Sequence, residues 1–133
     1  MATAGGCDIP GFMSEPLEFP LVCFDVDGTL VDDTVFIWQT LHDHFATDPE
    51  ARDKAHGDFF AGRITYADWF RTDLELLSFA GATKARIREV LDMLRPMDGA
   101  HEALHDLHRR GHTLAIVSGS LDIVVSHLFP DIP

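Results

Sequence analysis

Residues 24–33 read FDVDGTLVDD, and a short apolar run, LVCF at residues 21–24, leads into them. Such a run is typical of a buried strand, so Asp25 and Asp27 leave the end of that strand two residues apart. Gly28 follows and allows a sharp turn. Carboxylates at the carboxyl end of a buried strand are unfavourable unless a metal ion or a substrate compensates their charge. The pattern therefore predicts a site for a divalent cation and a phosphate ester.

The length and charge of the chain exclude several classes of partner. Its 133 residues suit one domain with a small insertion, and an apolar content of 46% is enough for a core. The net charge of −12 repels a nucleic-acid backbone and an anionic membrane surface, so we expect neither as a partner. No apolar run reaches the roughly 20 residues of a membrane helix, and the N-terminal residues do not resemble a secretory signal. We expect a cytoplasmic protein in which the Cys23 thiol is reduced and buried.

The remaining apolar patterns predict alternating strands and helices. A second apolar run at residues 113–117 predicts another buried strand, and a helix at residues 99–110 precedes it. Residues 36–95 carry apolar positions at helical spacing and predict a helical block between the two strands. Strands joined by crossover helices run parallel, and ligands bind beyond their carboxyl ends. Asp25 and Ser118 follow the two strand ends, so we expect them to meet at one edge of the sheet.

The residues at these strand ends permit attack on phosphorus. With a divalent cation to reduce charge repulsion, the Asp25 carboxylate can attack a phosphate ester and form an aspartyl-phosphate. Asp27 can protonate the leaving alkoxide and later accept a proton from water. The Ser118 hydroxyl and the Gly119 amide can bind phosphoryl oxygens, and Ser120 suits a helix cap. The structural alternative is a turn formed by the aspartates and an ordinary serine at a strand end.

Two of these segments resemble motifs of the haloacid dehalogenase superfamily. Residues 25–31, DVDGTLV, resemble its first motif, and residues 117–120, VSGS, resemble its second motif at the end of the next strand. The helical block resembles the C1-type cap of the phosphoserine-phosphatase-like branch. The resemblance implies a magnesium-dependent phosphatase with an α/β, Rossmann-like core of parallel strands. It makes Asp25 the nucleophile and a Mg²⁺ ligand through its carboxylate, and Asp27 the acid/base and a ligand through its carbonyl oxygen.

The resemblance also divides the chain into parts. Residues 1–19 are expected to form a flexible leader, residues 20–35 and 96–133 an incomplete core, and residues 36–95 the cap inserted after the first strand. Most aromatic residues of the cap are expected in its own core, and a minority at the entrance of a substrate pocket. The family's third motif, a lysine, and its fourth, a Gly-Asp pair with further acids, have no match in these 133 residues. The chain therefore resembles the N-terminal portion of a longer protein, or one whose sheet another chain completes.

The resemblance leaves the substrate open beyond a small phosphorylated metabolite. Phosphoserine-specific relatives carry a glutamate shortly after the first motif and an arginine in the cap, and Thr34 and Asp73 stand at the matching positions here. Arg63 and Arg71 remain as cap residues that can contact an anionic substrate. Two hypotheses follow: a phosphatase whose isolated 133-residue chain is inactive or weakly active, and a truncated, non-catalytic module with a binding or regulatory role. A receiver domain phosphorylated on aspartate fits less well, because the helical block interrupts its short strand-to-helix rhythm.

Overall fold

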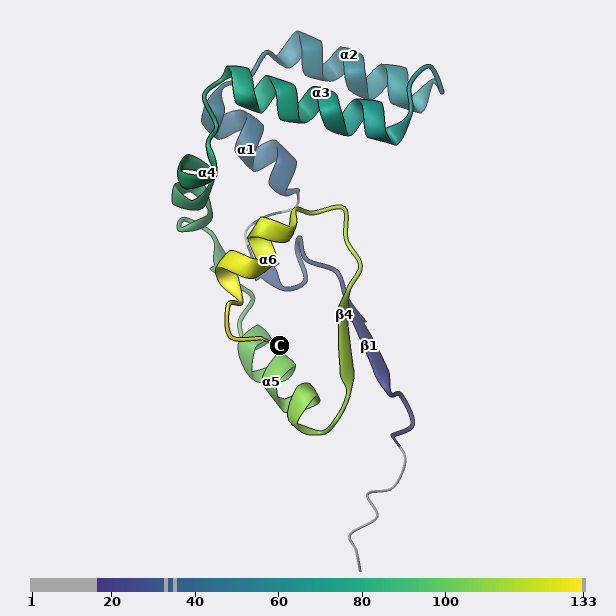
Figure 1. Ribbon diagram of the computed structural model, residues 1–133, viewed down its shortest axis with the longest axis vertical. Helices are drawn as coiled ribbons and strands as arrows, with labels where there is room; N and C mark the ends of the chain where they lie inside the picture. The colour runs from purple at the N-terminus through teal and green to yellow at the C-terminus, as the bar shows by residue number, and fades with distance from the viewer. Residues whose placement is uncertain (1–16, 33, 35, 133) are drawn as a thin grey trace, which may run out of the picture.

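The computed structural model describes residues 17–32, 34 and 36–132 and shows an elongated α/β molecule (Figure 1). Most of the expected leader at residues 1–19 lies outside the described residues. Figure 1 shows two strands side by side toward one end of the molecule and a pair of long helices at the other end. None of the described helices is long and apolar enough to cross a membrane.

The described residues alternate between short strands and helices, as the apolar patterns predict. In chain order the elements are β1 (Leu21–Phe24), β2 (Val31–Asp32), α1 (Ile37–Phe45), α2 (Pro49–Phe60), α3 (Tyr66–Phe79), α4 (Lys84–Leu91), β3 (Arg95–Pro96), α5 (Ala100–Arg109), β4 (Thr113–Ile116) and α6 (Asp122–Leu128). The helical block between the two longer strands is confirmed. The two-residue strands β2 and β3 are too short to produce an apolar pattern, and the sequence does not predict them.

The two strands that lead to the aspartates and to Ser118 run parallel. β1 pairs with β4 in a register that places Leu21 opposite Thr113 and Phe24 opposite Ile116. The two strands therefore end at the same edge of the sheet, as expected. β2 and β3 form a separate antiparallel pair, and within the described residues each sheet has two strands. The α/β class with a small parallel core is confirmed.

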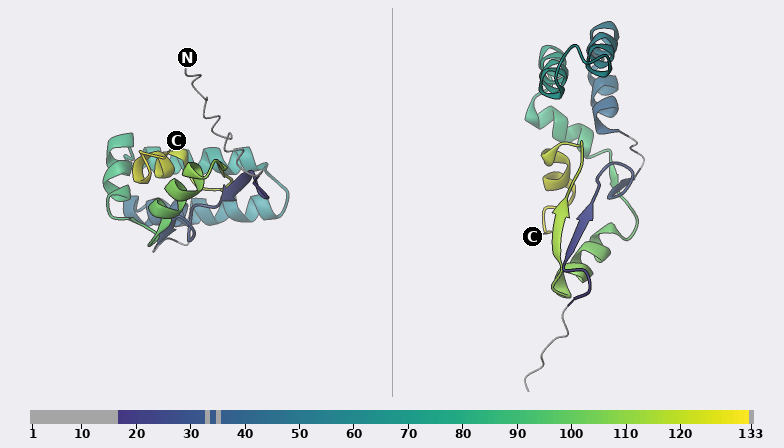
Figure 2. Two further views of the ribbon diagram at one scale, coloured as in Figure 1. Left: turned by 90° about the horizontal axis from the view of Figure 1, so that it is seen from below. Right: turned by 90° about the vertical axis from the view of Figure 1, so that its right-hand side faces the viewer.

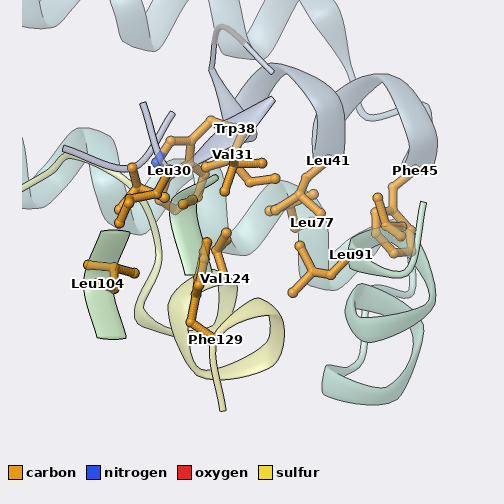
Figure 3. Close-up of a cluster of buried hydrophobic side chains, with 14 residues drawn as sticks. Leu30, Val31, Trp38, Leu41, Phe45, Leu77, Leu91, Leu104, Val124 and Phe129 are labelled. Atoms are coloured by element: carbon orange, nitrogen blue, oxygen red, sulfur yellow. The ribbon is translucent and has the colours of Figure 1, made fainter. Parts of the chain in front are cut away.

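The buried core lies among the helices and the loop after β1. Figure 3 shows its side chains, and Leu41 of α1, Leu91 of α4 and Val124 of α6 are fully buried. Burying an apolar side chain of this size contributes roughly 1.5–3 kcal/mol. Contacts between α4 and α6 hold α6, and with it the loop before α6, against the helical segment.

The strands themselves are less buried than predicted. Leu21 of β1 is 53% exposed and Ile116 of β4 is 43% exposed. Cys23, expected as a buried thiol, is exposed as well. Figures 1 and 2 show α5 and α6 on one side of the strand pair. The sheet has only two strands, and helices cover only one of its faces. The side chains on the other face therefore have no layer to pack against. The prediction of buried strands is wrong for this reason.

Side-chain caps determine where the central helices begin. Asp48 accepts hydrogen bonds from two backbone N–H groups in the first turn of α2. Thr65 and Asp68 form a reciprocal capping box at the start of α3. The Thr83 side chain accepts a hydrogen bond from the first turn of α4. Each cap is worth about 1 kcal/mol, so the helical segment is specified locally as well as by its core.

Candidate functional site

A tight loop after β1 positions the two aspartates. The backbone carbonyl of Val26 accepts hydrogen bonds from the N–H groups of residues 29–31. Gly28 has a φ of +72°, in the left-handed region that favours glycine. The chain therefore turns back immediately after the strand, and Asp25 and Asp27 stay at the strand end.

Asp25 is exposed and lies beside the loop that follows β4. Its Oδ1 accepts a hydrogen bond of 2.7 Å from the Val26 N–H. A hydrogen bond from the Ser118 side chain, and after it the bond from Val26, holds the pKa of the Asp25 carboxyl below its ordinary value of 3.8. The structure thus brings Asp25 and Ser118 together as predicted, and it keeps the carboxylate ionised to a lower pH than a free aspartate.

Asp27 connects three segments of the chain. Its Oδ2 accepts a hydrogen bond of 2.9 Å from the Ile37 N–H at the start of α1. Its Oδ1 accepts one of 3.0 Å from the Ser120 hydroxyl in the loop after β4. The backbone carbonyl oxygen of Asp27 accepts no hydrogen bond from the part of the chain that the structure describes. The carboxylate is therefore held in one orientation, and the carbonyl oxygen remains available to a ligand.

The loop after β4 is fixed by contacts from within and from α1. Ser118 Oγ accepts a hydrogen bond of 3.1 Å from the Ser120 N–H. The Gly119 carbonyl accepts one of 3.1 Å from the indole N–H of Trp38. Trp38 is 3% exposed, so this bond anchors the loop to the core of the helical segment.

Ser120 has a different role from the helix cap that its position suggests. α6 begins at Asp122, Leu121 stands at its N-cap position, and no side chain caps it. The Ser120 hydroxyl instead donates to Asp27, 93 residues earlier in the chain. The position of Ser120 just before a helix suggested a cap, and sequence reasoning therefore missed it as the partner of Asp27.

The two arginines predicted to contact substrate make no contact with the aspartates at the strand ends. Arg63 forms an ion pair of 2.7 Å with Asp58, and Arg71 forms one of 3.1 Å with Asp68. The two arginine side chains are 62% and 65% exposed. Each guanidinium already has a carboxylate partner in the α2–α3 region, so their contact with substrate stays a prediction.

Thr34 and Asp73, which the sequence resemblance predicts at substrate-contacting positions of the family, are both buried. Thr34 is 4% exposed, and its Oγ1 has no hydrogen-bond partner among the described residues. Asp73 is 5% exposed, and its Oδ1 lies 3.4 Å from Nε2 of His42. The other ring nitrogen of His42, Nδ1, lies 2.6 Å from Thr47 Oγ1. The helical segment thus holds a carboxylate and a histidine inside its own core.

The donor atoms at the strand ends suit a hard divalent cation, which prefers oxygen ligands. The Asp25 carboxylate and the Asp27 carbonyl oxygen are both open to such an ion. No group of three or more His, Cys, Asp or Glu side chains that could hold a metal occurs in residues 17–32, 34 and 36–132. The two oxygens at Asp25 and Asp27 could form only part of an octahedral Mg²⁺ shell. Mg²⁺ commonly keeps several water ligands for the remaining positions.

Comparisons with known proteins agree with this arrangement. A family model described as haloacid dehalogenase-like hydrolase matches residues 22–129, a span that holds both aspartates and the loop after β4. The phosphoserine phosphatase of Methanocaldococcus jannaschii is 26% identical over 108 residues, which make up 81% of this chain. The chain spans about half of that relative, 49% of its length.

Two solved structures have a similar fold. The phospho-aspartyl intermediate analogue of phosphoserine phosphatase superposes with a TM-score of 0.54 at 24% identity, covering 80% of this chain and 48% of the other. A HAD family hydrolase from Salmonella enterica subsp. enterica serovar Typhi gives a TM-score of 0.62 at 21% identity, covering 82% and 37%. At these identities the likeness is one of fold.

Proposed function

The chain belongs to the haloacid dehalogenase-like hydrolase family, and from this premise we propose that it carries the nucleophile and the phosphate-binding loop of a magnesium-dependent phosphatase. One observation carries the proposal: the parallel strands β1 and β4 end side by side, and the Ser118 side chain lies close enough to the exposed Asp25 carboxylate to lower its pKa. The similarity to a phosphoserine phosphatase supports a small phosphomonoester as the substrate.

Asp25 is the nucleophile in this proposal. Hydrogen bonds from Ser118 and Val26 keep its carboxylate ionised. A carboxylate oxygen forms a bond to phosphorus while the bond from phosphorus to the alkoxide breaks, which gives an aspartyl-phosphate. The Asp25 carboxylate and the Asp27 carbonyl oxygen would hold Mg²⁺, which would reduce the charge repulsion between the carboxylate and the phosphate.

Asp27 is the general acid and then the general base in this proposal. The Ile37 N–H and the Ser120 hydroxyl orient its carboxyl group toward the strand end. In its protonated form Asp27 gives a proton to the departing alkoxide. As a carboxylate it then accepts a proton from the water that hydrolyses the aspartyl-phosphate, which returns both aspartates to their starting states.

Ser118 and Gly119 bind the phosphoryl oxygens. The Ser118 hydroxyl already lies at the Asp25 carboxylate, where an incoming phosphoryl group arrives. The Gly119 N–H donates to no described residue, and a methyl group added at its Cα would meet nothing within 4 Å. The loop therefore offers the Ser118 hydroxyl beside Asp25 and a backbone N–H at Gly119 that is not used by the described residues.

The proposal includes partners that these residues do not supply. The lysine and the additional acids of the family's later motifs come from a following segment or from another chain that completes the sheet. The division into a core at residues 20–35 and 96–133 and a helical cap at 36–95, and a cytoplasmic location, are parts of the same proposal.

Phosphate release from p-nitrophenyl phosphate by the intact gene product tests this function. Asp25→Asn removes the nucleophile, and we expect kcat to fall by at least about 10³-fold. Asp32→Asn is the matched control, because it makes the same change in the same segment at a residue that pairs with Arg95. Full activity of Asp25→Asn would refute the proposal.

A non-catalytic module is the second candidate. It is favoured by the finding that no three His, Cys, Asp or Glu side chains of the described residues are grouped so that they could hold a metal ion. Calorimetric titration of the 133-residue chain with Mg²⁺ separates the two functions. The phosphatase predicts binding that Asp25→Asn abolishes, whereas the non-catalytic module predicts weak or absent binding in both proteins.

A further inference from the structure

A cavity of about 220 Å³ lies between α1, α3 and the loop after β4. Figure 1 shows this loop running from β4 toward α3 before it enters α6. Gly119 of the loop and Asp73 of α3 both line the cavity. The rest of the wall is aromatic and consists of Phe36, Trp38, Tyr66, Trp69 and Phe70. Aromatic residues thus line a cavity beside the loop after β4, and Trp38, Trp69 and Phe70 are among the aromatic residues of the expected cap.

Asp73 gives this cavity a negative charge that the protein compensates only in part. The residue is 95% buried, since its exposed fraction is 5%, and its Oδ1 has no hydrogen-bond partner in the described chain. Nε2 of His42 lies 3.4 Å from this oxygen, and an imidazole compensates a carboxylate only when it is protonated. A buried carboxylate is unfavourable unless a cation or several donors face it. A positively charged group in the cavity that Asp73 lines would offset the charge of this carboxylate.

The aromatic walls favour the same kind of ligand. The rings of Trp38 and Phe70 meet edge to face, with centroids 5.3 Å apart and an angle of 78°. Tyr66 and Trp69 do the same at 6.1 Å and 83°. Aromatic faces attract cations, most strongly the face of tryptophan, and two tryptophans line this cavity. Aromatic faces beside one carboxylate are a combination that recognises alkylated ammonium groups.

We infer that this cavity binds the alkylated ammonium end of a phosphomonoester while Ser118 and Gly119 bind its phosphoryl group. The inference rests on the proposed function and names its class of substrate. Gly119 belongs to both subsites, because it lines the cavity and its carbonyl accepts the Trp38 N–H. The cavity is smaller than the roughly 300–1,000 Å³ of drug-sized sites, which suits a compact head group.

Tryptophan fluorescence is a direct readout of this cavity. The chain contains two tryptophans, Trp38 and Trp69, and both line the cavity. The 133-residue chain is titrated with phosphocholine and with 3,3-dimethylbutyl phosphate, which has nearly the same shape and lacks the ammonium charge. We expect phosphocholine to change the emission and to bind at least about tenfold more tightly than the neutral compound.

Asp73→Asn tests the charge at nearly constant volume. We expect this variant to lose the preference for phosphocholine over 3,3-dimethylbutyl phosphate. Glu75→Gln is the matched control, because it removes one negative charge from an exposed position of the same helix, and it should keep the preference. Far-UV circular dichroism checks that both variants fold, and if Asp73→Asn does not, the comparison of the two ligands on the unmodified chain decides.

Equal binding of phosphocholine and 3,3-dimethylbutyl phosphate would overturn the inference. A preference for the neutral compound would overturn it too, and so would a preference for phosphocholine that Asp73→Asn retains. An unchanged emission with both compounds would overturn it as well. Hydrolysis of p-nitrophenyl phosphate that depends on Asp25, together with any of these results, would show that the inference fails and the proposed function stands. Binding of choline alone, with no hydrolysis by the intact gene product, would show the reverse.

Discussion

The helical segment and the strand pair of this chain differ in how well they bury apolar side chains. Ile37, Leu41 and Leu91 of the helices have no exposed surface, whereas Leu21 of β1 is 53% exposed and Val117 after β4 is 68% exposed. Helices bury one face by packing against neighbours that lie close in the chain. A strand needs further strands beside it and layers on its faces, and a two-stranded sheet is marginal alone. Asp25, the proposed nucleophile, therefore stands at the end of the less buried part of the molecule.

Specific contacts join the two regions at the candidate site. The Asp27 carboxylate accepts the Ile37 N–H of α1, and the Gly119 carbonyl accepts the Trp38 N–H of the same helix. Both bonds run from a strand end to the first turn of α1. The helical segment thus helps to hold the two loops that follow β1 and β4 and carry the residues of the candidate site.

The largest expected effect tests the difference in burial directly. Leu41→Ala removes a side chain with 0% exposure, and we expect it to lower the free energy of unfolding by about 2–5 kcal/mol. Leu21→Ala removes the same atoms from β1, where they are 53% exposed, and should cost less than about 1 kcal/mol. Urea denaturation measures both values. An equal cost would show that the strand pair is covered in solution.

A medium effect is expected where the two regions meet. Trp38→Phe removes the indole N–H that donates to Gly119, which should lower the free energy of unfolding by about 1 kcal/mol through that bond. Trp69→Phe makes the same change at a buried indole N–H that has no hydrogen-bond partner in the described chain. Chemical denaturation of both variants gives the difference. If Trp69→Phe is the more costly of the two, the Trp38 bond does not join the regions.

The smallest expected effect concerns the pKa of Asp25. Ser118→Ala removes the main cause of its lowered value, so the pKa of the Asp25 carboxyl should rise toward 3.8. Ser120→Ala is the control, because that hydroxyl donates to Asp27 instead. A carboxyl-detected NMR titration measures both variants, and the idea fails if Ser118→Ala leaves the titration of Asp25 unchanged.

The same lowered pKa fixes the sign of a pH effect on stability. Because the folded chain holds the pKa of Asp25 below that of the unfolded chain, the ionised carboxylate stabilises the fold above the unfolded value. This stabilisation is lost as the pH falls through the folded value. Ser118→Ala should therefore weaken the dependence of stability on pH below about pH 4, near the ordinary pKa of aspartate.

Local patterns in the sequence predict the elements and the meeting of the strand ends. The apolar runs at residues 21–24 and 113–117 end in polar residues, and parallel pairing then places Asp25 beside Ser118. The α3 helix, Tyr66–Phe79, follows directly from its apolar spacing and its Thr65 cap. The strands and helices themselves depend on residues that lie close together in the chain, and the rule that parallel strands end at one edge of a sheet then relates the two distant strand ends.

The features that the sequence does not predict depend on distant residues or on the number of layers. The exposure of Cys23 follows from a sheet of two strands with helices on one face, which no strand pattern can report. The bond from Ser120 to Asp27 spans 93 residues, and the bond from Trp38 to Gly119 spans 81. The cavity around Asp73 likewise needs α1, α3 and the loop after β4 in place.

The most direct test of this account is to trap the phosphoryl group on the protein. The intact gene product is mixed with Mg²⁺ and p-nitrophenyl phosphate, quenched in acid and digested, and its peptides are weighed by mass spectrometry. The account predicts that the peptide containing Asp25 gains one phosphoryl group in the unmodified protein and in Asp32→Asn, and gains none in Asp25→Asn. A phosphoryl group on another residue, or turnover that persists in Asp25→Asn, would contradict it.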